Sequence, residues 1–322
     1  MDQIVRQFDS VTVFGGASLD VVAQSTAPPV MGASNPGRAM RIPGGVGFNV
    51  AHVLARLGVR TRLVTRVGSD PQGKTVIEAA HAAGIDTSAI SQSVTAPTAA
   101  YHATLDDTGN LIIGIAAMDV ISEISPAQIG PAATAAPERD FWVVDANLDQ
   151  DTLAFLAVEA NNARRPITAL TVSPAKARRL SPLLDRLSYL FTNRREGAVL
   201  VADDPDDANI PATRIAGTLA RTRTTKVVVT NGNEPLAAAS GTDVRSYAPF
   251  RAAVSGVNGA GDAFAAGVIR GLASGHALND AIRFGLAASA MTVEAGSVVA
   301  AVLSEDALAE RMGAGPRRQM AL

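Results

Sequence analysis

Residues 46–84, VGFNVAHVLARLGVRTRLVTRVGSDPQGKTVIEAAHAAG, contain a helix pattern, a strand pattern and a second helix pattern in succession. The apolar spacing predicts helices over 46–58 and 71–84, and each of these patterns ends at a glycine, as helices commonly do. The stretch 61–68 between them is apolar and has the length of a buried strand. This succession is typical of a parallel sheet covered by helices.

The same alternation continues through the rest of the chain. Further strands are predicted at 11–16, 141–146, 166–170, 187–192 and 226–232, and further helices around 149–163 and 206–222. We therefore expect a three-layer α/β/α sandwich with a mainly parallel sheet and helices on both faces. The longest apolar stretch, 284–303, contains Glu294 and many small residues, so it predicts a core helix running into a strand and not a membrane span.

Two segments, about 21–43 and 94–118, have no helical period. Both contain short extended pieces, and LDDTGNLII (105–113) predicts a hairpin that turns at Asp106–Asn110. We expect them to form a small antiparallel β lid on a single domain spanning 1–322. The last residues, 312–322, predict a loose tail.

Composition excludes several classes of function. The chain has 322 residues, no cysteine and four scattered histidines, which argues against disulfides, thiolate chemistry and a catalytic zinc site. A net charge of −2 and 4% aromatic residues give no basis for binding nucleic acid or an anionic membrane. No signal peptide is visible at the N-terminus, so the expected location is cytoplasmic.

The stretch VSGVNGAGDAF (254–264) places Gly259, Ala260 and Gly261 directly before Asp262 and a helix pattern. Small residues at a helix N-terminus let backbone N–H groups approach an anion. An acid beside such an anion hole suits phosphoryl transfer to an alcohol, because it can take the proton of the hydroxyl. The alternative is an N-terminal Asp favoured by the helix dipole, with glycines for tight packing.

A second glycine cluster, Gly44 and Gly45, precedes the helix pattern that contains Asn49. Asn is a poor helix former, and hydrogen bonding to a polyol would explain it there. The alternative is that Asn49 caps a helix that starts slightly later. Asp145 and Asn147 lie at the C-terminal end of the strand predicted at 141–146, where α/β folds bind ligands, so they either face a substrate or cap the next helix.

A competing motif is GSDPQGKT (68–75), which fits the P-loop pattern G-x-x-x-x-G-K-[ST], and FWVVD (141–145) imitates the associated metal-binding strand. However, Pro71 supplies no N–H to a phosphate, and Asp70 places a negative charge inside the loop. On the favoured interpretation Lys74 is a solvated helix charge. A dinucleotide site is weaker still, because GVGFNV (45–50) lacks the third small residue. A non-enzymatic sugar-binding protein would leave the acid and the anion hole unexplained.

Five motifs, in order along nearly the whole chain, carry a resemblance to a known family. They are GGASLDVV (15–22), GGVGFNVA (44–51), VGSDPQG (67–73), NRRE (193–196) and GAGDAF (259–264). Together they resemble the ribokinase, or PfkB, family of carbohydrate and nucleoside kinases. The resemblance implies a ribokinase-like fold and an enzyme that phosphorylates a small-molecule hydroxyl with ATP and Mg²⁺.

The resemblance also implies roles for individual residues. Asp262 would be the general base, and the backbone of Gly259, Ala260 and Gly261 would hold the transferring phosphoryl group. The acceptor-binding residues would be Asp20, Gly44, Gly45 and Asn49, with Asp145 and Asn147 as further candidates. Asn193 and Glu196 would act on magnesium through water, and the ATP site would be lined by Asn193, Thr230 and Gly232. The alternative for Asp20 is a plain turn residue at a strand end.

Within the family, three segments are most similar to pseudouridine kinases: SNPGRAMRIPGGVGFNVA (34–51), LDDTGNLIIGIAAMDVIS (105–122) and VVDANLD (143–149). The implied reaction is phosphorylation of the 5′-hydroxyl of pseudouridine, with ribose, adenosine and inosine as other possible acceptors. The lid would close over the substrate, and two lids could pair in a homodimer.

The chain departs from the family pattern at four places. Three residues before GAGD, where the family commonly has Asp or Asn, this chain has Gly256. Whether a monovalent cation activates the enzyme is therefore left open. Ser173 and Pro174 replace an Asp-Pro pair, and Pro235 replaces the last glycine of the nucleotide loop TNGNEP (230–235). Phe48 stands where pseudouridine kinases often have Arg, so base preference could differ.

Overall fold

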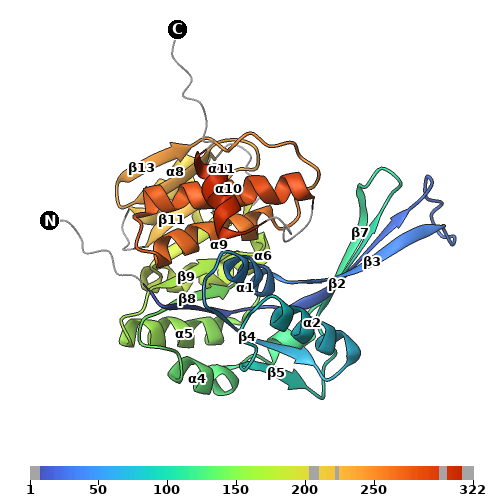
Figure 1. Ribbon diagram of the computed structural model, residues 1–322, viewed down its shortest axis with the longest axis horizontal. Coiled ribbons are helices and arrows are strands. Elements are labelled where there is room, and N and C mark those ends of the chain that lie inside the picture. Colours follow the sequence, from blue (N-terminus) through green and yellow to red (C-terminus); the bar gives the residue numbers. More distant parts are fainter. Residues whose placement is uncertain (1–7, 203–209, 222–224, 297–302, 314–322) are drawn as a thin grey trace, which may run out of the picture.

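A computed structural model describes residues 8–202, 210–221, 225–296 and 303–313. A nine-stranded sheet forms its centre, in the order β13-β12-β11-β10-β9-β8-β1-β4-β5 (Figure 1). Its strands are β1 Ser10–Phe14, β4 Thr61–Gly68, β5 Ile90–Ser93, β8 Asp140–Asp145, β9 Ile167–Leu170, β10 Tyr189–Asn193, β11 Lys226–Thr230, β12 Leu236–Ser240 and β13 Asp243–Tyr247. All pairs from β5 to β11 are parallel, and β12 and β13 add an antiparallel edge.

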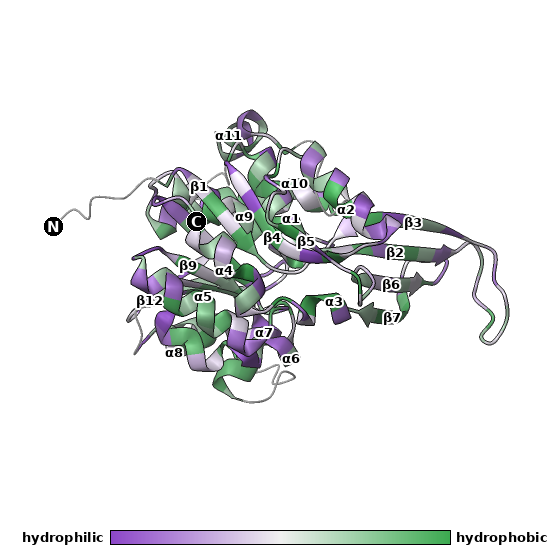
Figure 2. Cartoon of the chain, turned by 90° about the horizontal axis from the view of Figure 1, so that it is seen from below, coloured by the Kyte–Doolittle hydropathy of each residue, from purple (hydrophilic) through white to green (hydrophobic). Residues whose placement is uncertain are grey.

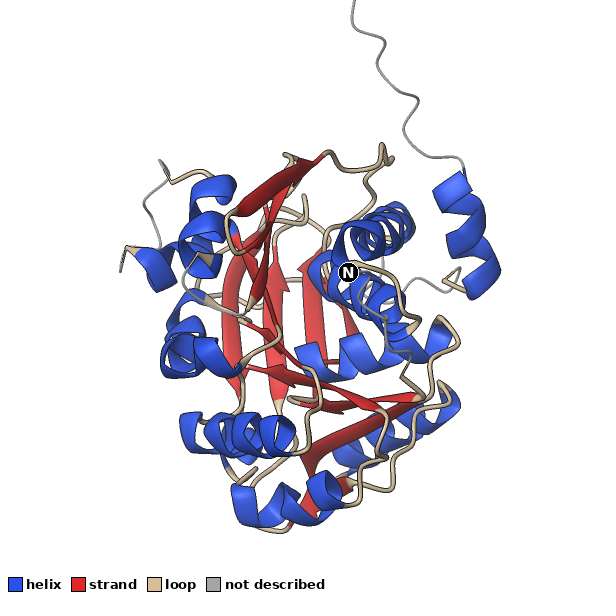
Figure 3. Ribbon diagram, turned by 90° about the vertical axis from the view of Figure 1, so that its left-hand side faces the viewer, coloured by secondary structure: helices blue, strands red, loops and turns tan. Residues whose placement is uncertain are grey.

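Helices cover both faces of this sheet, as Figure 3 shows from the side. One face packs against α1 Val46–Arg56, α2 Pro71–Ala82, α9 Ala260–Ala273, α10 Leu278–Ala295 and α11 Glu305–Gly313. The other packs against α3 Asp119–Ser122, α4 Pro126–Thr134, α5 Gln150–Asn162, the 3-10 helix η1 Arg178–Arg186, α7 Arg194–Val201 and α8 Ala212–Ala220. Helix α6 Pro174–Ala177 packs against α7 and η1. Strand β8 supplies Phe141 and Val143 to the first core and Trp142 and Val144 to the second. Because strand side chains alternate between faces, one apolar run fills two cores, and the expected α/β/α layering is confirmed.

A second sheet of four strands projects from the body (Figures 1 and 2). Its order is β3-β2-β6-β7, with β2 Ser18–Ser25, β3 Gly37–Gly44, β6 Ala100–Leu105 and β7 Leu111–Ala117. These strands lie largely in the two segments expected to form the lid, although β2 begins three residues before the first segment and β3 ends one residue after it. The predicted hairpin is β6–β7. The two outer pairs are antiparallel, but the central pair, β2 with β6, is parallel. The reason is that β2 and β6 continue from β1 and β5, which are themselves parallel in the large sheet.

Several predicted boundaries differ from the structure. The helix expected over 206–222 is described as α8 over Ala212–Ala220, and 206–209 and 222 lie outside the described residues. The helix in 284–303 is α10, while 297–302, where a strand was expected, also lies outside them. Residues 312 and 313 of the expected tail belong to α11, and 314–322 are not described. In the part of the chain that the structure describes, no helix combines the length and the apolar character needed to cross a membrane.

Helices α9 and α10 pack closely because glycines lie between them. A Cβ on Gly267 would lie 2.6 Å from the carbonyl oxygen of Phe284, and a Cβ on Gly285 would lie 2.6 Å from that of Phe264. Backbone atoms cannot move aside as a side chain can. This contact fixes the position of α9, whose first turn carries Asp262.

Gly267→Ala should therefore destabilise the protein although alanine favours a helix. Overpacking costs roughly 1–3 kcal/mol, which outweighs the helix propensity gained. Gly217→Ala in α8 is the control, because its Cβ would meet only the side chain of Val244, at 3.2 Å. Urea unfolding measures both variants, and an equal stability of Gly267→Ala and Gly217→Ala would contradict the expected close packing.

Candidate active site

The two glycine clusters meet where α1 and α9 begin. The amide nitrogen of Asn49 donates a hydrogen bond of 2.8 Å to Oδ2 of Asp262, across 213 residues of sequence. The N-cap of α1 is Gly45, with φ 91°, and the N-cap of α9 is Gly259, with φ 74°. Both are left-handed conformations that glycine adopts without strain. Two helix N-termini thus converge on one carboxylate.

The carboxyl group of Asp262 has a raised pKa. Its side chain is partly exposed, but the surrounding protein desolvates it, and this is the main reason why its pKa rises to about 7. The negative charges of Asp145 and Glu196 raise the pKa further, whereas the hydrogen bond from Asn49 lowers it. A carboxylate with a pKa near neutral is suited to accept a proton at physiological pH.

Asn49 keeps one polar atom free. Its side chain is 7% exposed, and its Oδ1 is buried without a hydrogen-bond partner among the described residues. A buried acceptor of this kind costs free energy unless a ligand satisfies it. Asn49 lies inside α1, whose N-cap is Gly45, so the alternative that Asn49 caps the helix is wrong.

Asp20 lies within β2, next to the start of α1. Its Oδ1 accepts hydrogen bonds from the Ser18 hydroxyl (2.7 Å) and from the Tyr101 N–H (3.3 Å). Burial is the main influence on its pKa and raises it, against the opposing effect of these bonds. A Cβ on Gly44 would lie 2.5 Å from Oδ2 of Asp20, which explains why glycine precedes Gly45. Asp20 is therefore part of the strand, and the alternative of a strand-end turn does not apply.

Asp145 uses both its oxygens on backbone groups. It is 1% exposed, and it accepts hydrogen bonds from the N–H of Gly16 and of Asn147, each 2.9 Å long. These bonds join the end of β8 to the loop after β1. The carboxylate shapes the edge of the site, and its charge reaches Asp262 electrostatically.

Lys176 is a residue that the sequence reasoning missed. Its Nζ donates a hydrogen bond of 2.6 Å to Oδ1 of Asn147, so it brings a positive charge to the carboxyl edge of the sheet. Burial and the neighbouring Arg179 lower its pKa, while Asp145 opposes this. The available signal was its place two residues after Pro174, close to the point where the chain departs from the family pattern.

Asn193 and Glu196 form a reciprocal cap at the start of α7. Oδ1 of Asn193 accepts from the Glu196 N–H (2.8 Å), and Oε1 of Glu196 accepts from Nδ2 of Asn193 (2.7 Å). The hydroxyl of Thr171 donates to the other oxygen of Glu196. The oxygens of Asn193 and Glu196 retain lone pairs, so they fit a magnesium ion that is bound through water. Among the described residues no group of three or more His, Cys, Asp or Glu could bind a metal ion without further ligands.

A pocket of about 700 Å³ opens beside Asp262. Thr230 and Gly232, from the loop after β11, line it together with Ala260 and Gly261 at the start of α9. Apolar side chains such as Phe264 and Leu286 form its wall. Two of the three residues expected at the nucleotide site and two of the three expected in the anion hole therefore share one pocket, whereas Asn193 and Gly259 are not part of its lining.

The P-loop interpretation does not survive. Asp70 caps α2, and its carboxylate accepts hydrogen bonds from the N–H of Gly73 (2.7 Å) and of Thr98 (2.8 Å). The N–H of Gly68 donates to the Thr98 hydroxyl (2.9 Å). These internal bonds use groups that a phosphate cradle would need. Lys74 is exposed beside Glu78, at 3.7 Å, as expected for a solvated helix charge.

Comparison with known proteins identifies the family of the chain. The chain matches the pfkB family carbohydrate kinases over residues 9–305, and it belongs to that family. It is therefore a ribokinase-like kinase, a phosphotransferase that acts on a sugar hydroxyl.

Individual relatives differ in substrate. The chain is 27% identical to the pseudouridine kinase of Escherichia coli over 293 residues, covering 90% of this chain and 92% of the relative. It is 26% identical to the ribokinase of Bacillus subtilis, covering 88% and 92%. The solved structure of a carbohydrate kinase from Agrobacterium tumefaciens is 33% identical, with a TM-score of 0.85, and the match covers 96% of this chain and 98% of that one.

Two substitutions should move the pKa of Asp262 in opposite directions. Asn49→Ala removes a hydrogen bond to the carboxylate and should raise the pKa above about 7. Glu196→Gln removes a negative charge and should lower it. Carboxyl carbon shifts, followed by NMR against pH, measure both. A shift in the same direction for both variants would contradict this electrostatic account.

Proposed function

We propose that this kinase transfers the γ-phosphoryl group of ATP to the 5′-hydroxyl of a ribose-type acceptor, and that the acceptor is pseudouridine. The observation that carries the reaction is Asp262, a carboxylate with a pKa of about 7 in the first turn of a helix that starts with small residues. The choice of pseudouridine rests on the similarity to the Escherichia coli enzyme and on the segments 34–51 and 105–122. The ribokinase relative makes ribose the second candidate.

The acceptor lies between the small sheet and the start of α1. Asp20 and the free Oδ1 of Asn49 accept hydrogen bonds from ribose hydroxyls. Gly44 and Gly45 let the backbone pack against Asp20 and Gly16, and this close packing shapes the wall that the sugar meets. Asn147 faces the same edge with its amide, and Asp145 supports that edge through its two backbone bonds.

Asp262 acts as the general base. Its ionised carboxylate takes the proton of the 5′-hydroxyl as the oxygen attacks the γ-phosphorus, and ADP leaves with the electrons of the broken P–O bond. The N–H groups of Gly259, Ala260 and Gly261 stabilise the charge on the transferring phosphoryl group, since a helix N-terminus favours an anion.

The nucleotide occupies the pocket of about 700 Å³. Thr230 and Gly232 line its phosphate end, and Asn193, which pairs with Thr230 at the end of the neighbouring strand β10, faces the phosphates from outside the pocket lining. Asn193 and Glu196 would hold magnesium through water, and the ion would supply positive charge to neutralise the phosphates.

The small sheet acts as a lid. Its closure excludes water, so that ATP is not lost to hydrolysis. The lid also presents large apolar side chains to solvent, which supports a homodimer through this sheet: Met40 (60% exposed), Leu111 (56%), Ile113 (53%) and Ile115 (57%).

Asp262→Asn should reduce kcat by about 10²–10⁴-fold and leave KM for the acceptor within a few-fold, because the amide keeps the shape but accepts no proton. In the unmodified enzyme kcat/KM should fall as the pH drops below about 7, since protonated Asp262 is inactive. Steady-state rates from pH 5.5 to 8.5 measure both. Lys74→Ala is the control and should behave as the unmodified enzyme. Near-normal turnover of Asp262→Asn would refute the assignment of the base.

The acceptor is tested by ADP release with ATP and Mg²⁺ across pseudouridine, uridine, adenosine, inosine and ribose. Pseudouridine should give the highest kcat/KM. Preference for ribose would keep the mechanism and replace the substrate. ATP hydrolysis without transfer to any acceptor would count against the proposed kinase reaction.

A further inference from the structure

The loop between β4 and α2 contains an acid, Asp70, that the proposed reaction does not use. Besides the N–H of Gly73, its carboxylate accepts both the hydroxyl (2.6 Å) and the N–H (2.8 Å) of Thr98. The same hydroxyl accepts the N–H of Gly68 (2.9 Å). A side chain at Gly68 or Gly73 would collide with this cluster, so the glycines of VGSDPQG are needed for it. The segment is built to hold Thr98, which lies two residues before β6.

Thr98 lies where the second hairpin of the small sheet leaves the body, two residues before β6. The residues that follow it bond directly to β2. The N–H of Leu19 donates to the carbonyl of Ala99 (2.9 Å), and the N–H of Tyr101 donates to Oδ1 of Asp20 (3.3 Å). Four consecutive residues, 98–101, therefore connect Asp70 to the carboxylate proposed to bind the acceptor.

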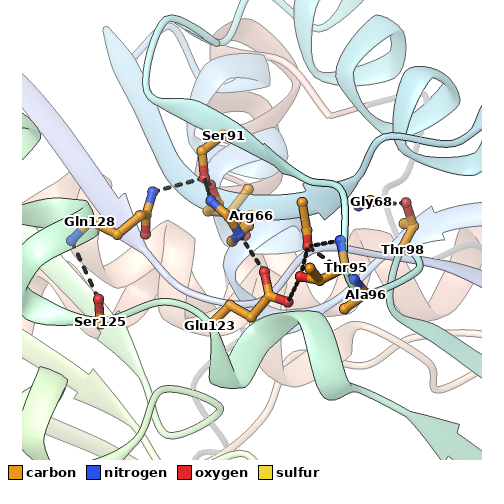
Figure 4. Close-up of polar contacts among 11 residues, drawn as sticks. Arg66, Gly68, Ser91, Thr95, Ala96, Thr98, Glu123, Ser125 and Gln128 are labelled. Carbon is orange, nitrogen blue, oxygen red and sulfur yellow. Dashed lines mark hydrogen bonds and ion pairs between the residues drawn. The ribbon is translucent and has the colours of Figure 1, made fainter.

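A second acid holds the other parts of this junction (Figure 4). Glu123 lies just after α3, where the hairpin returns, and accepts the hydroxyl of Thr95 (2.7 Å) and the Nε of Arg66 (2.7 Å). Both ends of the hairpin are thus bonded to the body. Of these two anchors, Asp70 is the one closer to Asp20 along the chain. It bonds Thr98, two residues before β6, whereas Glu123 bonds Thr95, which lies three residues further from β6.

The Asp70 contact has the character of a charge-assisted bond. Burial opposes ionisation of Asp70, but the hydrogen bonds from Thr98 and Gly73 outweigh it, and the pKa of the carboxyl is lowered. Asp70 is therefore ionised at neutral pH, and hydrogen bonds to a charged acceptor are stronger than neutral ones.

We propose that Asp70 is a positioning residue for the acceptor: it holds residues 98–101 in place, so that Tyr101 orients the carboxylate of Asp20. This role rests on the proposed function of Asp20. It predicts that loss of the Asp70–Thr98 contact weakens use of the acceptor, while use of ATP on the far side of Asp262 stays unchanged.

The test is Asp70→Asn. Asparagine caps a helix as well as aspartate does, so α2 should persist, but its NH₂ group cannot accept the N–H of Thr98. KM for pseudouridine should rise about tenfold, the size of one lost hydrogen bond to a charged group, with KM for ATP within about twofold. Asp86→Asn is the matched control, because Asp86 also accepts a backbone N–H, from Ser88 (3.0 Å), but bonds Arg62 instead of the small sheet.

Thr98→Val and Thr98→Ser provide a second pair of variants. Valine loses the hydroxyl that bonds Asp70 and should raise KM for the acceptor, whereas serine keeps it and should restore the original value. Equal kinetic effects of Asp70→Asn and Asp86→Asn, or an unchanged acceptor KM in both Asp70→Asn and Thr98→Val, would overturn the positioning role.

Hydrogen exchange gives a readout that does not depend on catalysis. The amide of Tyr101 should exchange faster in Asp70→Asn and at the original rate in Asp86→Asn. Unchanged exchange in Asp70→Asn would overturn the proposal even if the kinase assignment holds. An unmodified enzyme that phosphorylates no acceptor would refute the kinase reaction instead, and the exchange rates would still decide whether Asp70 holds β6.

Discussion

The hydrogen bond between Asn49 and Asp262 joins the beginnings of α1 and α9, and the rest of the site depends on that approach. Glycines make it possible on both sides: Gly45 packs against the backbone of Gly16, and Gly267 packs against α10. The positive ends of two helices then surround one acid. Its pKa nevertheless rises to about 7, because burial and the charges of Asp145 and Glu196 outweigh the favourable hydrogen bond.

The acids of the site differ in how many of their hydrogen bonds are already made. Asp145 and Asp70 use both oxygens on neighbouring protein groups, so they fix loops. Among the described residues, Asp20 accepts bonds from Ser18 and Tyr101 on one oxygen only, and Asp262 accepts one bond on one oxygen. A carboxylate with unused lone pairs can still accept a hydroxyl, which separates the acids that build the site from those proposed to act in it.

Sequence patterns predicted most of the large sheet because its strands are apolar runs separated by helix patterns with clear ends. They missed β12, LAAAS, since alanine has little strand preference and this strand is defined by its pairing with β11. They also missed the parallel pairing of β2 with β6. Register between distant strands depends on where each one leaves the large sheet, which no local pattern records. The sequence patterns also did not identify Lys176, because its contact with Asn147 exists only in the folded chain.

The sequence by itself determined the α/β class, the two glycine clusters and the identity of Asp262 as the candidate base, because each depends on residues that are neighbours in the chain. Only the tertiary structure decided which carboxylates keep an oxygen without a hydrogen-bond donor among the described residues. It also decided that VGSDPQG holds Thr98 and not a phosphate. The physical reason is that a carboxylate's role depends on its burial and its hydrogen-bond donors, and these donors come from segments far away in sequence.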